Sequence, residues 1–340
     1  MSRVEEGNAI YSPVTMHRYC SCCLGIVTAL ALVGCGGNGK KGGGTTPDSL
    51  FGVYWVEQRV DSGAMTYDVY TNPDGIHEAL LKSTPQLKED NTQIRVNTMR
   101  WSDRSFVGYR YAAPYTHCMS FSLDTGATTE KFQLPQSEGA YISSAEPARC
   151  HSAISESIAM QVSERNPTTG KNLNRLLLFK DGSATPQVLL SASFNDGNTA
   201  PKMQPVDVAA DGRVLAITSQ GLVIFSGGTQ SILVRAGQNP GSACFSPDGH
   251  RVAFSQGGTK PGWKISGLSG AAAKPIPGME TFADLRWADE THVIACNGIG
   301  SDRKISLVDI ETGKISPLVV PGTRDNTLIN DFGPLPLFGP

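Results

Sequence analysis

The segment Ala243–Ser255 reads ACFSPDGHRVAFS, which is the pattern of two short strands joined by a tight turn. Pro247 presets the backbone angle φ and Gly249 accepts a positive φ, so the tripeptide Pro-Asp-Gly favours a turn for a physical reason. After the turn, Val252 and Phe254 alternate with smaller residues, as expected for a half-buried strand. The segment therefore predicts a β-hairpin.

Weaker copies of this unit occur at 99–109, 151–162, 206–217 and 285–295. The copies recur roughly every 35 to 55 residues, which is the length of one four-stranded propeller blade with loops of variable size. Acidic residues recur near the turns, namely Asp103, Asp211, Asp248 and Asp289. This recurrence favours a role in the turns over a role in catalysis.

Two further strands are expected in each repeat. Lys304–Ile310 and Ile315–Val319 flank a turn that contains glycine, and Met119–Leu123 precedes another such turn and Thr129–Leu134. Each pair predicts a second hairpin that follows the first one.

The two ends of the chain supply the parts of one more repeat. Phe51–Val56 and Met65–Tyr70 read as second and third strands with no first strand before them, whereas Leu328–Leu337 reads as a first strand. Pairing them would leave no loose end in the ring. We therefore predict an all-β fold over residues 50–340. It is a six-bladed β-propeller of four-stranded antiparallel blades, closed by pairing of the N- and C-terminal strands, with five or seven blades as alternatives.

The sequence FSPDG at 245–249, followed by Val-Ala-Phe, resembles the repeat signature of the TolB-like, or WD40-like (PD40), β-propeller family. The resemblance covers about residues 50–340, with one sharp repeat and partial copies at Trp101 and Trp287. We find no pattern for the separate N-terminal α/β domain of TolB. The resemblance implies a propeller fold, and some relatives of this fold are lyases or accompany peptidase domains.

Leu32-Val33-Gly34-Cys35 closes an apolar run that begins near residue 22, after a short basic stretch. The run is about a dozen residues, shorter than the roughly 20 that a spanning helix needs. The order aliphatic, aliphatic, small, cysteine resembles the lipobox of bacterial lipoproteins. The resemblance implies that residues 1–34 are a signal peptide, with Met16 as an alternative start. It also implies that Cys35 carries lipid such as palmitate.

Residues 35–49 comprise this cysteine and a glycine-rich polar segment, which we expect to act as a flexible tether. The segment matches the spacing G-x-G-x-x-G at 37–42, but that motif works between a strand and a helix, and here an expected signal peptide precedes it and a polar linker follows it. We therefore expect no nucleotide cofactor. Gly36 follows the cysteine, where lipoproteins retained in the inner membrane tend to have Asp. We therefore predict a lipid-anchored protein of the cell envelope, on the outer membrane facing the periplasm in a Gram-negative cell.

The chain of 340 residues has a formal net charge of −2 and no block of basic residues, so we expect no nucleic-acid partner. Beyond Cys35, the cysteines are Cys118, Cys150, Cys244 and Cys296, and their spacing matches no zinc pattern. We expect them to be small buried apolar residues, with a Cys118–Cys150 disulfide as the alternative if adjacent blades carry the two thiols.

The histidines of the same part of the chain are scattered: His77, His117, His151, His250 and His292. We expect surface or structural roles, with a metal site near the two Cys-His neighbours as the alternative. The sequence predicts no catalytic residue, metal ligand or cofactor. Its aromatic residues are expected to pack in the core, with a carbohydrate surface as the alternative: Tyr54, Trp55, Trp101, Tyr109, Tyr111 and Trp287.

Two functional hypotheses remain. The first is a non-enzymatic lipoprotein whose propeller binds an envelope protein or the cell wall, because propellers present a wide rigid face with adaptable loops. The second is an extracytoplasmic enzyme, a polysaccharide lyase or a glycan- or peptide-processing enzyme, with its active site at the central channel. No sequence motif supports catalysis, so we favour the binding scaffold.

Overall fold

The computed structural model describes residues 53–334 except 62–63, 72–78, 86–93, 101–104, 113–114, 123–124, 126, 149, 152–156, 181–182, 184, 196–197, 258–261, 271, 298–303 and 320–326. The expected signal peptide, the tether and Cys35 lie outside the described residues, as do His77, Trp101 and Asp103. Among the described residues, no helix is both long enough and apolar enough to cross a membrane.

The described strands form six sheets, and the strands that follow one another along the chain within a sheet are antiparallel. One sheet contains β25 (Thr327–Pro334), β1 (Val53–Asp61), β2 (Ala64–Thr71) and β3 (Ala79–Pro85). The next contains β4 (Ile94–Arg100), β5 (Ser105–Ala112), β6 (Tyr115–Ser122) and β7 (Thr128–Gln133). A third contains β8 (Tyr141–Pro147), β10 (Ile158–Arg165), β11 (Lys171–Phe179) and β12 (Gln187–Asn195).

The second half of the chain continues this order. The fourth sheet contains β13 (Met203–Val208), β14 (Val214–Thr218), β15 (Gly221–Ser226) and β16 (Thr229–Arg235), with the short β9 (Cys150–His151) parallel to β13. After the 3-10 helix η1 (Ala236–Gln238), the fifth contains β17 (Pro240–Phe245), β18 (Arg251–Gln256), β19 (Gly262–Gly267) and β20 (Lys274–Pro275). The sixth contains β21 (Phe282–Trp287), β22 (His292–Asn297), β23 (Lys304–Asp309) and β24 (Ile315–Val319).

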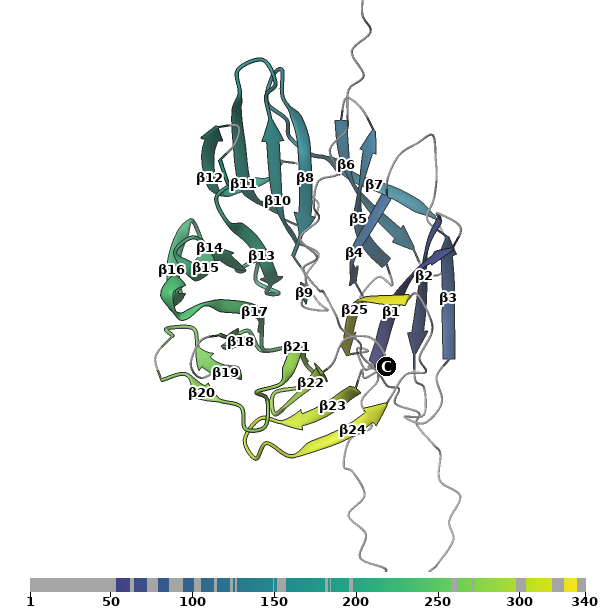
Figure 1. Cartoon of the computed structure of the whole chain (residues 1–340), viewed down its shortest axis with the longest axis vertical. Coiled ribbons are helices and arrows are strands. Elements are labelled where there is room, and N and C mark those ends of the chain that lie inside the picture. Colours follow the sequence, from purple (N-terminus) through teal and green to yellow (C-terminus); the bar gives the residue numbers. More distant parts are fainter. Residues whose placement is uncertain are drawn as a thin grey trace, which may run out of the picture.

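The sheets lie around a common centre, and the first strand of each repeat lies on the inner side of its sheet (Figure 1). In the fourth sheet the short β9 lies further in, beside β13. These inner strands contact one another in the order β4, β8, β13, β17, β21, β25, and β25 contacts β4 in turn. The strand nearest the C-terminus, β25, pairs with β1 along most of its length. The all-β class and the antiparallel sheets expected from the sequence are therefore confirmed.

Each inner strand carries a β-bulge, where its pairing with the second strand of the sheet skips residues. The skipped positions are Asn97, Ser143, Val206, Gly241–Ser242, Ala283 and Asn330. A bulge bends a strand and increases its twist. Its recurrence in all six sheets shows that the repeats share backbone geometry even where their sequences share little.

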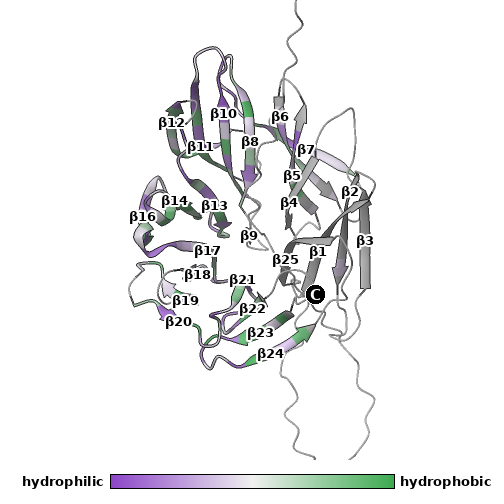
Figure 2. Cartoon of the chain, in the orientation of Figure 1, coloured by the Kyte–Doolittle hydropathy of each residue, from purple (hydrophilic) through white to green (hydrophobic). Residues whose placement is uncertain are grey.

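The hydrophobic core is divided among the spaces between neighbouring sheets. One cluster joins the sheet of β4–β7 to the sheet of β8–β12, and there the rings of Phe132 and Phe179 stack with centroids 3.6 Å apart. Three further clusters fill the next three spaces around the ring. Hydrophobic and hydrophilic stretches both occur along β10 and β11 (Figure 2), and most residues of the two strands are buried. Sheets packed against one another in this way cover both faces of their middle strands, so β14 is buried throughout.

The repeat expected at 151–162 differs from the sequence interpretation. Its first strand is β8, which pairs with β10, whereas Cys150–His151 forms β9 and pairs with β13 of the next sheet. The segment 152–156 contains no Pro-Asp-Gly or Ala-Asp-Gly turn, so the chain has no local signal for a tight hairpin before β10. The first strand of this repeat, β8, lies upstream and has the mostly polar sequence YISSAEP, which carries little hydrophobic signal.

Candidate functional site

The β17–β18 hairpin is built by a dense set of hydrogen bonds around Asp248. Its carboxylate accepts hydrogen bonds from Ser246 Oγ and the His250 backbone amide, and Ser246 Oγ in turn accepts one from the amide of Arg251. Gly249 has φ +70°, as the turn requires. Slight burial raises the pKa of Asp248, but these hydrogen bonds outweigh it and hold that pKa below its ordinary value.

The same role recurs in two other hairpins. Asp211 accepts a hydrogen bond from the backbone amide of Arg213, and Asp289 accepts them from the amides of Thr291 and His292. The recurring acids therefore close turns, as the sequence predicted for these positions. Asp103, the fourth member of the set, lies outside the described residues.

An arginine that follows the turn connects each of two hairpins to the next sheet. Arg213 donates to the carbonyl of Gly249 at 2.8 Å, and its guanidinium lies 5.4 Å from the ring centre of Phe245. One sheet further on, Arg251 donates at 2.6 Å to Glu290, and it lies 5.0 Å from the ring centre of Trp287. Each arginine thus combines a hydrogen bond with a cation–π contact across the gap between sheets.

Replacing Arg251 with Ala is expected to lower the free energy of unfolding by about 1 kcal/mol, because a partly exposed hydrogen bond and a cation–π contact are lost together. Urea unfolding followed by tryptophan fluorescence measures this change. Lys202→Ala is the matched control, since it removes an exposed cation just before β13. Equal stability of the two variants would contradict the role of Arg251 in linking the sheets.

Asp207 is a fully buried carboxylate on inner strand β13. It accepts backbone hydrogen bonds of 2.7 Å from Val208 and from Phe245 of the neighbouring inner strand β17. Burial raises the pKa of Asp207 to about 7. The two backbone hydrogen bonds, with a smaller contribution from the Arg286 guanidinium, oppose that rise.

Arg286 and Asp284 lie on inner strand β21 and are mostly buried. Arg286 Nη1 is 3.1 Å from Asp284 Oδ1 and also donates to the Leu285 carbonyl. Its guanidinium lies 4.3 Å from the ring centre of Phe332 on β25, so it connects the last two inner strands. Asp284 accepts a further hydrogen bond from the amide of Leu285.

Asp207, Asp284 and Arg286 are three ionisable side chains of the inner strands that are buried or mostly buried. Both carboxylate oxygens of Asp207 are engaged by backbone amides, and Asp284 and Arg286 are paired with each other. Asp207 and Arg286 thereby connect neighbouring inner strands, whereas Asp284 contacts residues of its own strand through Oδ1. The sequence reasoning missed Asp207 as a site residue, although an acid between two valines in an expected buried strand is a usable signal.

The structure describes the side chains of some of the histidines and cysteines that the sequence analysis singled out. His117 Nδ1 lies 2.8 Å from Glu130 Oε1, and His292 Nδ1 lies 3.1 Å from Asp289. Cys118, Cys244 and Cys296 are buried, as expected for small apolar residues. The side chains of Cys150 and His151 lie outside the described residues, so the Cys118–Cys150 disulfide stays a prediction. Within the described ranges no group of three or more His, Cys, Asp or Glu side chains is placed to hold a metal.

Of the aromatic residues singled out in the sequence, the structure describes the side chains of two. Tyr109 and Trp287 are buried in clusters between sheets, as expected for core packing. The side chains of Tyr54, Trp55, Trp101 and Tyr111 lie outside the described residues.

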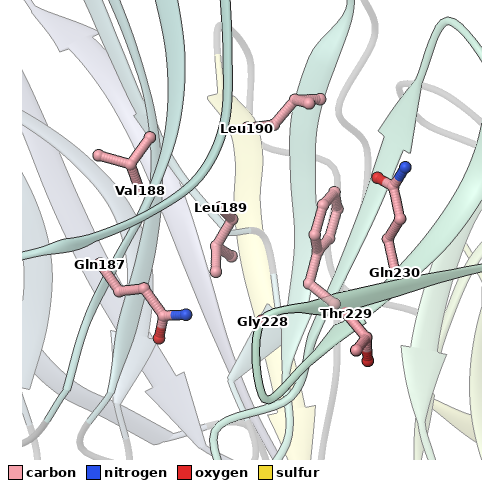
Figure 3. A pocket seen from close by; sticks show the side chains of 8 residues that line it. Gln187, Val188, Leu189, Leu190, Gly228, Thr229 and Gln230 are labelled. Atoms are coloured by element: carbon pink, nitrogen blue, oxygen red, sulfur yellow. The ribbon is translucent and has the colours of Figure 1, made fainter.

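A pocket of about 350 Å³ lies on the outer side of the ring, between β12 and the β15–β16 hairpin. Figure 3 shows Gln187 to Leu190 on one side and Gly228 to Gln230 on the other. Phe225, which is buried, completes the lining. The sequence reasoning did not anticipate this pocket, because no motif marks a gap between the outer edges of two sheets.

No family profile and no curated protein matches the chain. Solved structures do match. TolB from Acinetobacter baumannii has 12% sequence identity and a TM-score of 0.55, and the match covers 84% of this chain and 66% of that one. A nidogen/laminin complex has 10% identity, a TM-score of 0.50 and coverage of 84% and 98%. Oligogalacturonate lyase in complex with manganese has 10% identity, a TM-score of 0.50 and coverage of 77% and 74%. At this level of identity the likeness concerns the fold alone, and it establishes that the chain has a TolB-like β-propeller fold.

Proposed function

We propose that this protein is an extracytoplasmic lipoprotein, anchored to a membrane by lipid on Cys35, whose β-propeller is a scaffold that binds a protein or another cell-envelope component. The observation that carries the proposal is Leu32-Val33-Gly34-Cys35 at the end of a short apolar run, followed by a polar tether and a propeller. In a Gram-negative cell the protein would lie on the outer membrane and face the periplasm, because Gly36 follows Cys35 in place of Asp.

The blade number belongs to the same proposal. The six sheets, their recurring inner bulge, the circuit of inner-strand contacts and the β1–β25 pairing support a six-bladed propeller closed by its terminal strands. A ring that unites both ends of the chain in one sheet leaves no free terminal strand. The tether would then connect the lipid anchor to a rigid domain.

The likeness to TolB and to a structure titled as a nidogen/laminin complex supports a protein partner. The likeness to oligogalacturonate lyase favours the alternative, an enzyme of polysaccharides. The state of the inner-strand charges supports the scaffold, because Asp207, Asp284 and Arg286 are engaged with backbone amides, with one another or with an aromatic ring.

The anchor is tested by replacing Cys35 with Ser. Cells that express the wild-type protein and are fed an alkyne-tagged fatty acid are expected to label it and to retain it in the membrane fraction. Cys35→Ser is expected to lose the label completely, because the thiol is the atom that carries the lipid, and to accumulate as the uncut precursor.

Cys23→Ser is the matched control, since it removes a thiol from the expected signal peptide and should leave the labelling unchanged. Labelling that persists in Cys35→Ser would refute the anchor at this residue. Polysaccharide cleavage by the purified protein, abolished in a variant of an inner-strand residue, would instead favour the enzyme.

A further inference from the structure

Outer strand β12 lacks the protection that the other outer strands carry. An exposed strand edge is a template for another strand, and proteins usually block it with charged residues or proline. β12 has the sequence QVLLSASFN, with neither, over nine residues. Each of the other outer strands has at least one such residue: Lys82 and Pro85 in β3, Glu130 and Lys131 in β7, Arg235 in β16, Lys274 and Pro275 in β20, and Pro317 in β24.

The geometry of β12 suits the addition of a strand. It is the last strand of its sheet, and it pairs with β11 on one side. A bulge interrupts this pairing at Leu189, after which the six residues Leu190–Asn195 pair without a break. Bulges at the outer edge occur in other sheets too, for example between β15 and β16, so this bulge does not protect β12 in particular. A regular, uncharged edge is therefore available.

The pocket lies beside the first residues of this edge. Val188 is 52% exposed there, although it is a large apolar residue. Across the pocket, the Gly227-Gly228 turn has positive φ at both residues, and a Cβ at Gly228 would meet nothing within 4 Å. The lining contains no charged residue. An apolar side chain that entered would gain buried area and would meet no unpaired charge.

We propose that β12 is a docking edge for an extended, uncharged segment of a partner protein, which adds to it as an antiparallel strand and places an apolar side chain in the pocket. The lack of charge along both the edge and the pocket selects an uncharged partner, since a charged one would be desolvated with nothing to pair it. The inference rests on the proposed scaffold function and names the surface that would perform it.

A second copy of β12 fits this surface less well. Besides Val188, the exposed residues of β12 are Ser191, Ser193 and Asn195, and Phe194 is half-buried. A paired copy would therefore bring mainly polar side chains to the pocket and would leave its apolar residues Val188, Leu189 and Phe225 without an apolar partner. The occupant is expected to be a different chain with a free apolar side chain.

The test uses the full-length protein in detergent and a positional-scanning library of acetylated, amidated nonapeptides, with fluorescence anisotropy as the readout. Ser193→Lys is expected to weaken binding of the selected peptides by about tenfold or more, because it restores a charge to the edge. Thr129→Lys, at an exposed position of outer strand β7, is the matched control and should bind as the wild type does. Hydrogen exchange is expected to slow in Gln187–Asn195 when peptide is bound.

Each outcome decides the proposal. Selection of uncharged peptides, loss of binding in Ser193→Lys and slower exchange in β12 together support it. Binding that is equal in both variants, or selection of charged peptides, overturns it. A dimer that Ser193→Lys dissociates overturns it in favour of a second copy. If a partner crosslinks in cells to another face of the propeller, the scaffold function stands and this edge is excluded. If no peptide binds and no partner crosslinks, the docking edge and the scaffold function are both refuted.

Discussion

Glu164→Ala is expected to destabilise the protein by about 3 to 5 kcal/mol, because it would leave the Arg175 guanidinium buried without its counter-ion. Glu164 is 1% exposed and Arg175 is 14% exposed, and the two side chains form an ion pair between β10 and β11. The carboxylate also accepts a hydrogen bond from the amide of Ser137, and Arg175 donates to the Pro135 carbonyl. The pair therefore holds the segment that connects β7 to β8 against β10 and β11.

A double variant distinguishes the cost of losing the ion pair from the cost of leaving one buried charge without a partner. Glu164→Leu combined with Arg175→Met removes both charges and keeps similar volume, so it is expected to recover most of the lost stability. Glu130→Ala removes an exposed acid from β7 and serves as the control. Urea unfolding measures all of the variants. A double variant as unstable as Glu164→Ala would contradict this account, because the cost would then come from the removed hydrogen bonds.

Asp207 is expected to make the protein less stable as pH rises from about 4 to 7. Burial raises the pKa of Asp207 to about 7 in the folded protein, whereas an unfolded Asp has a pKa of about 3.9. Between these values the folded protein holds the proton and the unfolded chain releases it, so stability falls with pH and then levels off above pH 7. Relative to Asp207→Asn, which cannot ionise, the wild type should lose about 2 to 3 kcal/mol between pH 5 and pH 8.

The measurement is the difference in unfolding free energy between the wild type and Asp207→Asn at those two pH values. The contributions of the other titrating groups are the same in both proteins and cancel in this difference. Asp211→Asn, at an exposed turn carboxylate, is the control and should follow the pH profile of the wild type. A constant difference between the wild type and Asp207→Asn would show that the carboxyl stays ionised in the folded protein at both pH values.

The hairpin at 243–255 was the most predictable part of the fold. Its turn residues impose their own geometry, and the structure has β17, a turn and β18 at the expected places. The outer hairpin of β23 and β24 was equally readable, since glycine and alternating apolar residues mark it. Local signals of this kind act through neighbouring residues, so one sequence suffices to detect them.

The remaining features depend on contacts between repeats. Strand β8 has a weak apolar pattern, and it is a strand because β10 pairs with it. The partners of Glu164, Asp207 and Arg251 are distant in the sequence, and only the ring brings them together. The open edge at β12 is visible only once the strand is known to be outermost. Sequence spacing does not show which distant residues come into contact, so the partners of these side chains and the outer pocket could not be predicted. Asp207 itself could have been singled out, because it lies between two valines in an expected buried strand.

In-cell crosslinking of the membrane-anchored protein, followed by mass spectrometry, tests the scaffold function most directly. The Cys35→Ala form is the control, because it should keep the propeller and lose the lipid. The account predicts one dominant crosslinked envelope partner that is enriched with the wild type and depleted with Cys35→Ala. The same background of weak adducts in both forms, with no enriched partner, would contradict a scaffold and direct attention to activity on polysaccharides and peptides.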